Sequence, residues 1–121
     1  MRTLVTGGAG FIGSHICQEL LSRGHQVVAV DNLANGRLEN FDEFGNSKNF
    51  EFQEIDILDR SRLTPHFKGV DWVFHMAGLA DIVPSIEKPD LYFDVNVKGT
   101  LNVLEVAKGA GVKRFAYAAS S

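Results

Sequence analysis

The segment Thr6–Gly13 has the sequence TGGAGFIG and connects a short apolar run to a segment with helical periodicity. Gly8, Gly10 and Gly13 fit the spacing G-x-G-x-x-G, and with Gly7 in place of Gly8 the stretch also fits G-x-x-G-x-x-G. Side chains here would exclude the backbone angles of a tight turn, hold a pyrophosphate away from the backbone and separate the helix from the strand. The segment therefore predicts a dinucleotide-binding turn, with the helix N-terminus facing the phosphates.

Short apolar runs and helical spacings alternate along the whole chain. The apolar runs predict strands at residues 3–6, 26–30, 50–55, 71–76 and 113–119. Helical spacings predict helices at 11–23 and at 59–67, the latter capped by Asp59, and Gly24 and Gly111 stand where helix C-caps belong. A further long helix is predicted, with one apolar face formed by Phe93, Val97, Leu101, Leu104 and Ala107.

The order of these elements predicts the fold class. Residues 32–48 are polar and predict a loop with at most one short helix. Elsewhere strands alternate with helices, which requires crossover connections and parallel pairing. We therefore expect an α/β fold of the Rossmann type, a doubly wound parallel sheet with strand order 3-2-1-4-5.

The composition excludes several functional classes. The chain has 121 residues, a formal net charge of -3 and no segment rich in Lys or Arg, so neither nucleic acid nor a membrane surface is an expected partner. No apolar run approaches the roughly 20 residues of a membrane span.

Cys17 is the single cysteine, which excludes an internal disulfide and fits a reducing compartment, most simply the cytoplasm. The histidines lack the spacing of metal ligands, so we expect no metal site.

Asp31 ends the second predicted strand about 20 residues beyond the glycine turn. At this place a carboxylate accepts hydrogen bonds from the hydroxyls of an adenosine ribose. The same charge would repel a 2′-phosphate, and Asn32 and Leu33 carry no positive charge to offset it. We therefore predict NAD rather than NADP, while FAD and S-adenosylmethionine, which also bind such turns, remain alternatives. A phosphate-binding loop of the NTPase type is excluded because Ser14 stands where that loop has a Lys.

Six segments together resemble the extended short-chain dehydrogenases, and among them the nucleotide-sugar epimerases and dehydratases. Besides the glycine turn they are Asp31-Asn32-Leu33 with Asn35, Asp56-Ile57, His75-Met76-Ala77-Gly78, Asn96-Val97-Lys98-Gly99-Thr100 and Ala118-Ala119-Ser120-Ser121. The resemblance covers the whole chain and implies that residues 1–121 are the NAD(P)-binding Rossmann domain at the front of a longer enzyme. The cofactor contacts that it implies come from Gly7, Gly10, Phe11, Ile12, Gly13, Asp31, Asn32, Leu33, Asn35, Gly36, Asp56, Ile57, Met76, Ala77, Gly78, Ala80 and Asn96.

The resemblance also implies an activity. In this family NAD oxidises a nucleotide sugar at one carbon and usually returns the hydride, with a Tyr-x-x-x-Lys pair and a Ser or Thr around the reacting hydroxyl. Ser120 falls at the Ser position, and Ser121 is its rival if the register differs by one. The expected function is an NAD-dependent nucleotide-sugar 4-epimerase that forms a homodimer. A 4,6-dehydratase, a decarboxylase and a noncatalytic NAD(P)-binding sensor remain alternatives.

Two departures from the family pattern bear on this expectation. Neither Tyr92 nor Tyr117 is followed by Lys four residues later, so the chain contains no Tyr-x-x-x-Lys pair, and the sugar-binding C-terminal part of the family fold is absent. We therefore expect the chain alone to be inactive. The second departure is Ala80, because the galactose epimerase branch of the family has a Lys near this position.

His75 lies at the end of the fourth predicted strand, near the cofactor crevice. We interpret it as a packed histidine rather than an acid or base.

Overall fold

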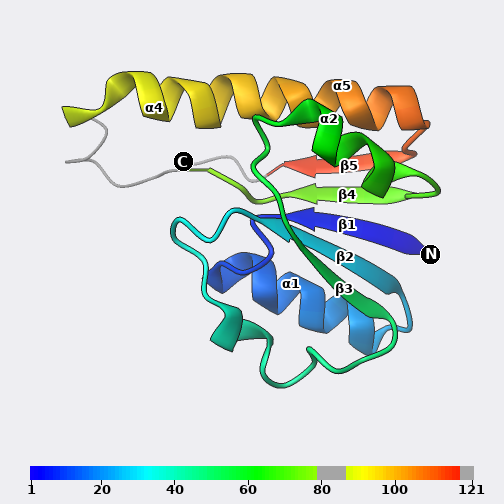
Figure 1. Cartoon of the computed structure of the whole chain (residues 1–121). Coiled ribbons are helices and arrows are strands. Elements are labelled where there is room, and N and C mark those ends of the chain that lie inside the picture. Colours follow the sequence, from blue (N-terminus) through cyan, green and yellow to red (C-terminus); the bar gives the residue numbers. More distant parts are fainter. Residues whose placement is uncertain (79–86, 118–121) are drawn as a thin grey trace.

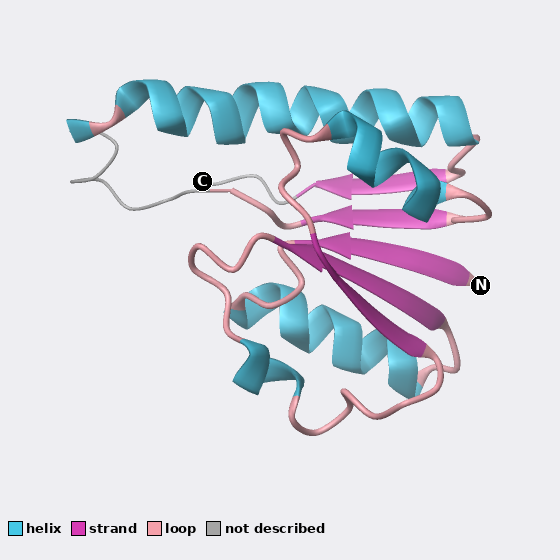
Figure 2. Ribbon diagram, in the orientation of Figure 1, coloured by secondary structure: helices cyan, strands magenta, loops and turns pink. Residues whose placement is uncertain are grey.

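The computed structural model describes residues 1–78 and 87–117. Within these residues a sheet of five parallel strands forms the middle layer (Figures 1 and 2). Its order is β3-β2-β1-β4-β5, which confirms the predicted doubly wound topology. The strands are β1 (Arg2–Thr6), β2 (Gln26–Asp31), β3 (Phe50–Glu54), β4 (Trp72–His75) and β5 (Arg114–Tyr117).

Helices cover both faces of the sheet, as Figure 1 shows. On one face lies α1 (Phe11–Ser22), close to the short 3₁₀ segment η1 (Leu38–Phe41). The other face carries α2 (Arg60–Leu63), η2 (Thr64–Phe67) and a long continuous helix made of α4 (Pro89–Phe93), the π-helical segment η3 (Asp94–Gly99) and α5 (Thr100–Ala110).

The sheet is buried between two apolar layers. Leu4 and Val73 belong to the layer under α2 and α5, whereas Val5 and Cys17 belong to the layer under α1. The central strands β1 and β2 are therefore buried on both faces, which explains their almost continuous apolar sequence. Burial raises the pKa of the Cys17 thiol to about 12, so this cysteine is an inert part of the core.

The predicted helix ends are confirmed. Gly24 has φ +85° and follows α1 after Arg23, and Gly111 has φ +74° directly after α5, so both adopt the left-handed conformation that glycine tolerates best. At the start of α2 the Asp59 carboxylate accepts a hydrogen bond from Arg62 N at 3.3 Å.

The apolar face predicted for the long helix is not the face that packs on the sheet. The side chains that form it are between 43% and 53% exposed, namely Phe93, Val97, Leu101 and Leu104. Of the predicted face Ala107 is buried, and the helix turns Gly99, Val103 and Val106 toward the sheet instead. A Cβ at Gly99 would lie 2.5 Å from Cδ1 of Ile57, so the absent side chain lets the helix approach this layer closely. The helix has two apolar stripes, and periodicity alone does not tell which one is buried.

Candidate functional site

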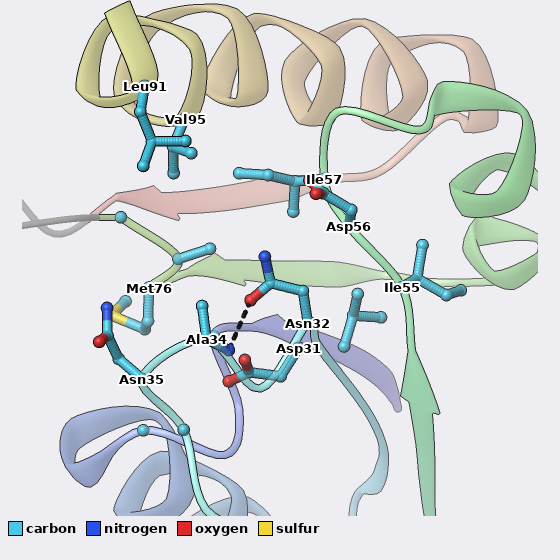
Figure 3. Close-up of a pocket in the computed structure, with 16 residues that line it drawn as sticks. Asp31, Asn32, Ala34, Asn35, Ile55, Asp56, Ile57, Met76, Leu91 and Val95 are labelled. Carbon is cyan, nitrogen blue, oxygen red and sulfur yellow. Dashed lines mark hydrogen bonds between the residues drawn. The ribbon is translucent and has the colours of Figure 1, made fainter. Parts of the chain in front are cut away.

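A cleft opens at the carboxyl ends of the strands, where the strand order reverses between β1 and β4 (Figure 3). It holds about 770 Å³ of empty space including its open mouth. The lining residues are Gly7, Gly10, Val30, Asp31, Asn32, Ala34, Asn35, Gly36, Ile55, Asp56, Ile57, Met76, Ala77, Gly78, Leu91 and Val95.

Most of the predicted cofactor residues belong to this lining. The predicted residues that do not are Phe11, Ile12, Gly13, Leu33 and Asn96. Ala80, the predicted catalytic Ser120 and its rival Ser121 lie outside the described residues. Lining residues that the sequence did not indicate are Val30, Ala34, Ile55, Leu91 and Val95. The first three and Val95 adjoin predicted positions along the chain, whereas Leu91 comes from the long helix and has no predicted neighbour.

The glycines of the turn have different structural roles. Gly7 has φ +65°, and a Cβ there would lie 2.7 Å from Ala77 N. At Gly13 a Cβ would collide with Gly7 O, so this glycine lets α1 pack against the turn. At Gly10 the nearest atom to a Cβ is Gly7 O at 3.2 Å, and the residue lines the cleft. Gly7 and Gly13 are therefore required by the fold, whereas a Cβ at Gly10 would make one tight contact at the wall of the cleft.

The N-terminus of α1 begins at the same turn. The first helical hydrogen bond runs from Ser14 N to Gly10 O at 2.9 Å, so the N–H groups of Phe11, Ile12 and Gly13 precede the helical ladder. The side chains of Phe11 and Ile12 are 77% and 63% exposed. These residues therefore bring backbone donors and the positive end of the helix dipole to the turn, which together favour an anion.

The Asp31 carboxylate is held in the cleft by two backbone donors. Its Oδ2 accepts from Ala9 N at 3.0 Å, and its Oδ1 accepts from Leu33 N at 2.8 Å. Leu33 has φ +63°, which turns the chain directly after Asp31, and its side chain packs in the α1 layer. A Cβ at Gly36 would lie 2.7 Å from Oδ2, so glycine is also required where the loop returns. Each carboxylate oxygen can accept a further hydrogen bond from a ligand hydroxyl.

The side of the cleft toward the long helix is mostly apolar. Figure 3 shows Leu91 and Val95 pointing from α4 and η3 toward the cleft, with Ile57 beside them below the long helix. Two polar side chains at this end are held by their own loops. Asn32 Oδ1 accepts a hydrogen bond from Ala34 N at 3.0 Å, and Asp56 Oδ1 accepts one from Leu58 N at 2.9 Å. An apolar slot with a polar edge suits an aromatic base.

His75 lies beneath the cleft and does not line it. Its side chain is 1% exposed, and burial lowers its pKa to about 4, so the ring is neutral at neutral pH. Its Nδ1 lies 2.6 Å from Oγ1 of Thr6, and its Nε2 lies 2.9 Å from Oγ1 of Thr100. The interpretation as a packed histidine is confirmed.

Two further findings concern the described residues as a group. Among residues 1–78 and 87–117, no cluster of three or more His, Cys, Asp or Glu side chains is placed to hold a metal ion. Within the same part of the chain, no helix has the length and apolar character needed to cross a membrane.

Comparison with known proteins decides the family. Residues 3–121 match the model of the NAD dependent epimerase/dehydratase family. The chain belongs to the NAD-dependent epimerase/dehydratase family. This confirms the resemblance drawn from the sequence, and the family's cofactor is NAD, as Asp31 predicts.

Individual members of the epimerase/dehydratase family are similar over the whole chain. A UDP-glucose 4-epimerase of Klebsiella pneumoniae is 43% identical and is covered over 90% of its length. That of Erwinia amylovora is 44% identical, and this chain spans 37% of its length. The crystal structure of a UDP-glucose 4-epimerase from Stenotrophomonas maltophila with bound NAD and formylated UDP-arabinopyranose has a TM-score of 0.92 at 38% identity, with all of this chain and 37% of that enzyme covered.

Proposed function

We propose that the cleft binds NAD, with the adenosine ribose at Asp31 and the pyrophosphate at Gly10. The observation that carries the proposal is that the fixed carboxylate of Asp31 and the backbone of Gly10 line one cleft. The carboxylate accepts hydrogen bonds from ribose hydroxyls, and the N-terminus of α1 attracts the phosphates. Its charge also disfavours the 2′-phosphate of NADP.

The other predicted residues have distinct roles in this proposal. Phe11, Ile12 and Gly13 supply backbone N–H groups, and Leu33 fixes Asp31 through its own N–H. The adenine lies near Asn32, Asp56 and Ile57, and the nicotinamide lies toward Met76, Ala77 and Gly78. A Cβ at Gly78 would lie 3.3 Å from Oδ1 of Asn96, so Asn96 lies close to this segment and stays among the proposed cofactor residues. Ala80 stays among the proposed contacts because of the family resemblance.

The proposal extends to the whole protein, a UDP-sugar 4-epimerase of which residues 1–121 form the NAD-binding domain. The similarity to several UDP-glucose 4-epimerases, at 38–44% identity, supports this activity. Bound NAD supplies the chemistry by accepting a hydride from the sugar and returning it. The residues of this chain bind and orient the cofactor, and Ser120 is the proposed donor of a hydrogen bond to the sugar oxygen.

Titration calorimetry of the 121-residue chain tests the cofactor proposal directly. We expect NAD to bind more tightly than NADP, and FAD and S-adenosylmethionine to bind more weakly than either. Tighter binding of NADP, or no heat of binding with NAD, would contradict the proposal. Incubation with NAD and UDP-sugars, followed by NMR, is expected to show no epimer, because the chain contains no Tyr-x-x-x-Lys pair.

The exposed stripe of the long helix supports the proposed homodimer. The outer stripe, defined as Phe93, Val97, Leu101 and Leu104, presents large apolar side chains to solvent along three helical segments. Two copies of such a stripe bury each other when the helices of two subunits pack about a two-fold axis. Light scattering is expected to show a dimer that Leu101→Glu converts to a monomer. Leu38→Glu, at a similarly exposed leucine on η1, is the control, and a monomeric parent chain would contradict the proposal.

A further inference from the structure

The side chain of His75 belongs to a chain of hydrogen bonds that joins three elements. Its Nδ1 is 2.6 Å from Oγ1 of Thr6 in β1, and its Nε2 is 2.9 Å from Oγ1 of Thr100 at the start of α5. Phe115 and Tyr117 of β5 pack on the imidazole, with ring centroids at 6.0 and 5.9 Å. The neighbours of the ring on β1, α5 and β5 are therefore uncharged side chains.

The partners of Thr100 fix the proton on one ring nitrogen. The Thr100 hydroxyl donates its hydrogen to Asn96 O at 2.8 Å. A hydroxyl has a single hydrogen, so toward His75 its oxygen can only accept. Nε2 of His75 therefore carries a proton.

The partners of Thr6 fix the other nitrogen independently. Oγ1 of Thr6 accepts from Met76 N and from Ala77 N, each at 3.1 Å. These two donors fill both lone pairs of the oxygen, so the Thr6 hydroxyl donates to Nδ1 of His75, which must be unprotonated. Both ends thus give the same neutral tautomer, and burial of the ring, which lowers its pKa to about 4, keeps it neutral.

This chain of hydrogen bonds ends on the wall of the cleft. Met76 and Ala77 are lining residues, and Gly7 of the glycine turn abuts Ala77 N. Met76 N also donates a hydrogen bond to the carbonyl oxygen of Thr6 at 3.1 Å, so it has two acceptors. Within the described structure, the acceptor for Ala77 N is the Thr6 hydroxyl. The position of Ala77 therefore depends on the hydroxyl of Thr6.

We propose that His75 is a positioning residue that connects the β4 end of the NAD cleft to the long helix through its hydrogen bonds with Thr6 and Thr100. These hydrogen bonds require a single tautomer of the ring. The role in NAD binding rests on the proposed function, whereas the hydrogen-bond chain itself does not. With the proton moved to Nδ1, the Thr6 oxygen would face three N–H donors with two lone pairs, so the hydrogen bonds that it accepts from Met76 N and Ala77 N would weaken or one of them would be lost. The tautomer of His75 and the position of Ala77 are therefore coupled.

Nitrogen-15 NMR of the histidine rings in the 121-residue chain tests the proton arrangement. We expect a neutral His75 with the proton on Nε2 and with Nδ1 as an acceptor. In Thr100→Val the second tautomer becomes populated, exchange of the Ala77 amide hydrogen accelerates about tenfold, and NAD affinity falls several-fold, since a buried donor loses its partner. Thr100→Ser keeps the hydroxyl and restores all three readouts.

Thr3→Val is the matched control for these measurements. Thr3 is as buried as Thr6 on the same strand, but its hydroxyl donates to Gln26 O at 2.7 Å, away from the chain that ends at Ala77. A parent chain with the proton on Nδ1, or a Thr100→Val chain whose Ala77 exchange matches that of Thr3→Val, would overturn the proposal. If the parent chain shows the expected tautomer and exchange but does not bind NAD, the proposed function fails and the positioning of Ala77 stands.

Discussion

The two sides of the cleft present different chemistry to a ligand. The turn side, defined as the glycine turn together with residues 30–36, offers a fixed carboxylate and the N-terminus of α1. The helix side, defined as residues 76–78 together with Leu91 and Val95, offers backbone and apolar side chains. Directional groups fix the orientation of a ligand, whereas apolar surface contributes binding free energy in proportion to the area it covers.

This difference has a structural origin. On the turn side, Asp31 accepts hydrogen bonds from Leu33 N, two residues later in the sequence, and from Ala9 N in the neighbouring glycine turn. On the helix side, the position of Leu91 and Val95 depends on how the long helix docks over Ile57 through Gly99. We therefore expect substitutions on the turn side to change binding more than substitutions of comparable size on the helix side.

The largest effect is expected for Gly10→Val. The branched side chain enters the cleft where the pyrophosphate is proposed to lie, while the protein atom nearest to a Cβ is Gly7 O at 3.2 Å. NAD affinity should fall at least ~1000-fold, or about 4 kcal/mol, with a native circular dichroism spectrum. Gly109→Val is the control, because a Cβ there meets nothing within 4 Å. A Gly10→Val chain that binds NAD like the parent would show that the turn is not the phosphate site.

The next effect concerns His75, whose ring bonds Thr6 of β1 and Thr100 of the long helix. Its pKa of about 4 in the folded chain lies below the value of 6.5 for a free histidine, so the unfolded chain binds more protons between these values. Stability contributed by the neutral ring is therefore complete above about pH 6.5 and is lost as the pH falls through about 4. Urea unfolding should show an acid-dependent loss that is about 3 kcal/mol larger in the parent chain than in His75→Gln between about pH 7 and about pH 4. Equal losses in the two chains would contradict the assignment.

Asp31→Asn should have a smaller effect on the choice between cofactors. The substitution removes the charge that opposes a 2′-phosphate but keeps one acceptor oxygen for the backbone donors. The preference for NAD over NADP should decrease about tenfold, or about 1.4 kcal/mol, in calorimetric titrations. Asp42→Asn, at the end of η1 and outside the cleft lining, should leave the preference unchanged. An unchanged preference in Asp31→Asn would mean that another residue selects the cofactor.

The smallest effect is expected on the helix side. Leu91→Ala removes apolar surface from the cleft, but Leu91 is 45% exposed, so NAD affinity should fall only about threefold. Leu101→Ala, on the outer stripe of the same long helix, should leave the affinity unchanged. If Leu91→Ala weakens binding as strongly as Gly10→Val does, the proposed difference between the two sides is wrong.

The same difference explains how much was predictable from sequence. The glycine turn, Asp31 and the strand order follow from local spacing and from the alternation of elements, and the structure confirms the topology. Leu91 and Val95 were not found because their approach to the cleft depends on contacts between distant segments. The outer stripe was predicted as the apolar face of the long helix, but it is exposed. The close approach of Gly99 to Ile57 turns the opposite face of the helix toward the sheet. Periodicity identifies apolar stripes, but tertiary packing decides which stripe is buried.

The central claim is that NAD lies across both sides of this cleft, and amide NMR of the nitrogen-15-labelled chain during titration with NAD tests it most directly. We expect the largest shift changes at Gly10, Asp31 and Ala77, with saturation at a single affinity. Changes confined to the separate hollow between α2 and α5, lined by Arg60 and Glu105, would contradict the claim.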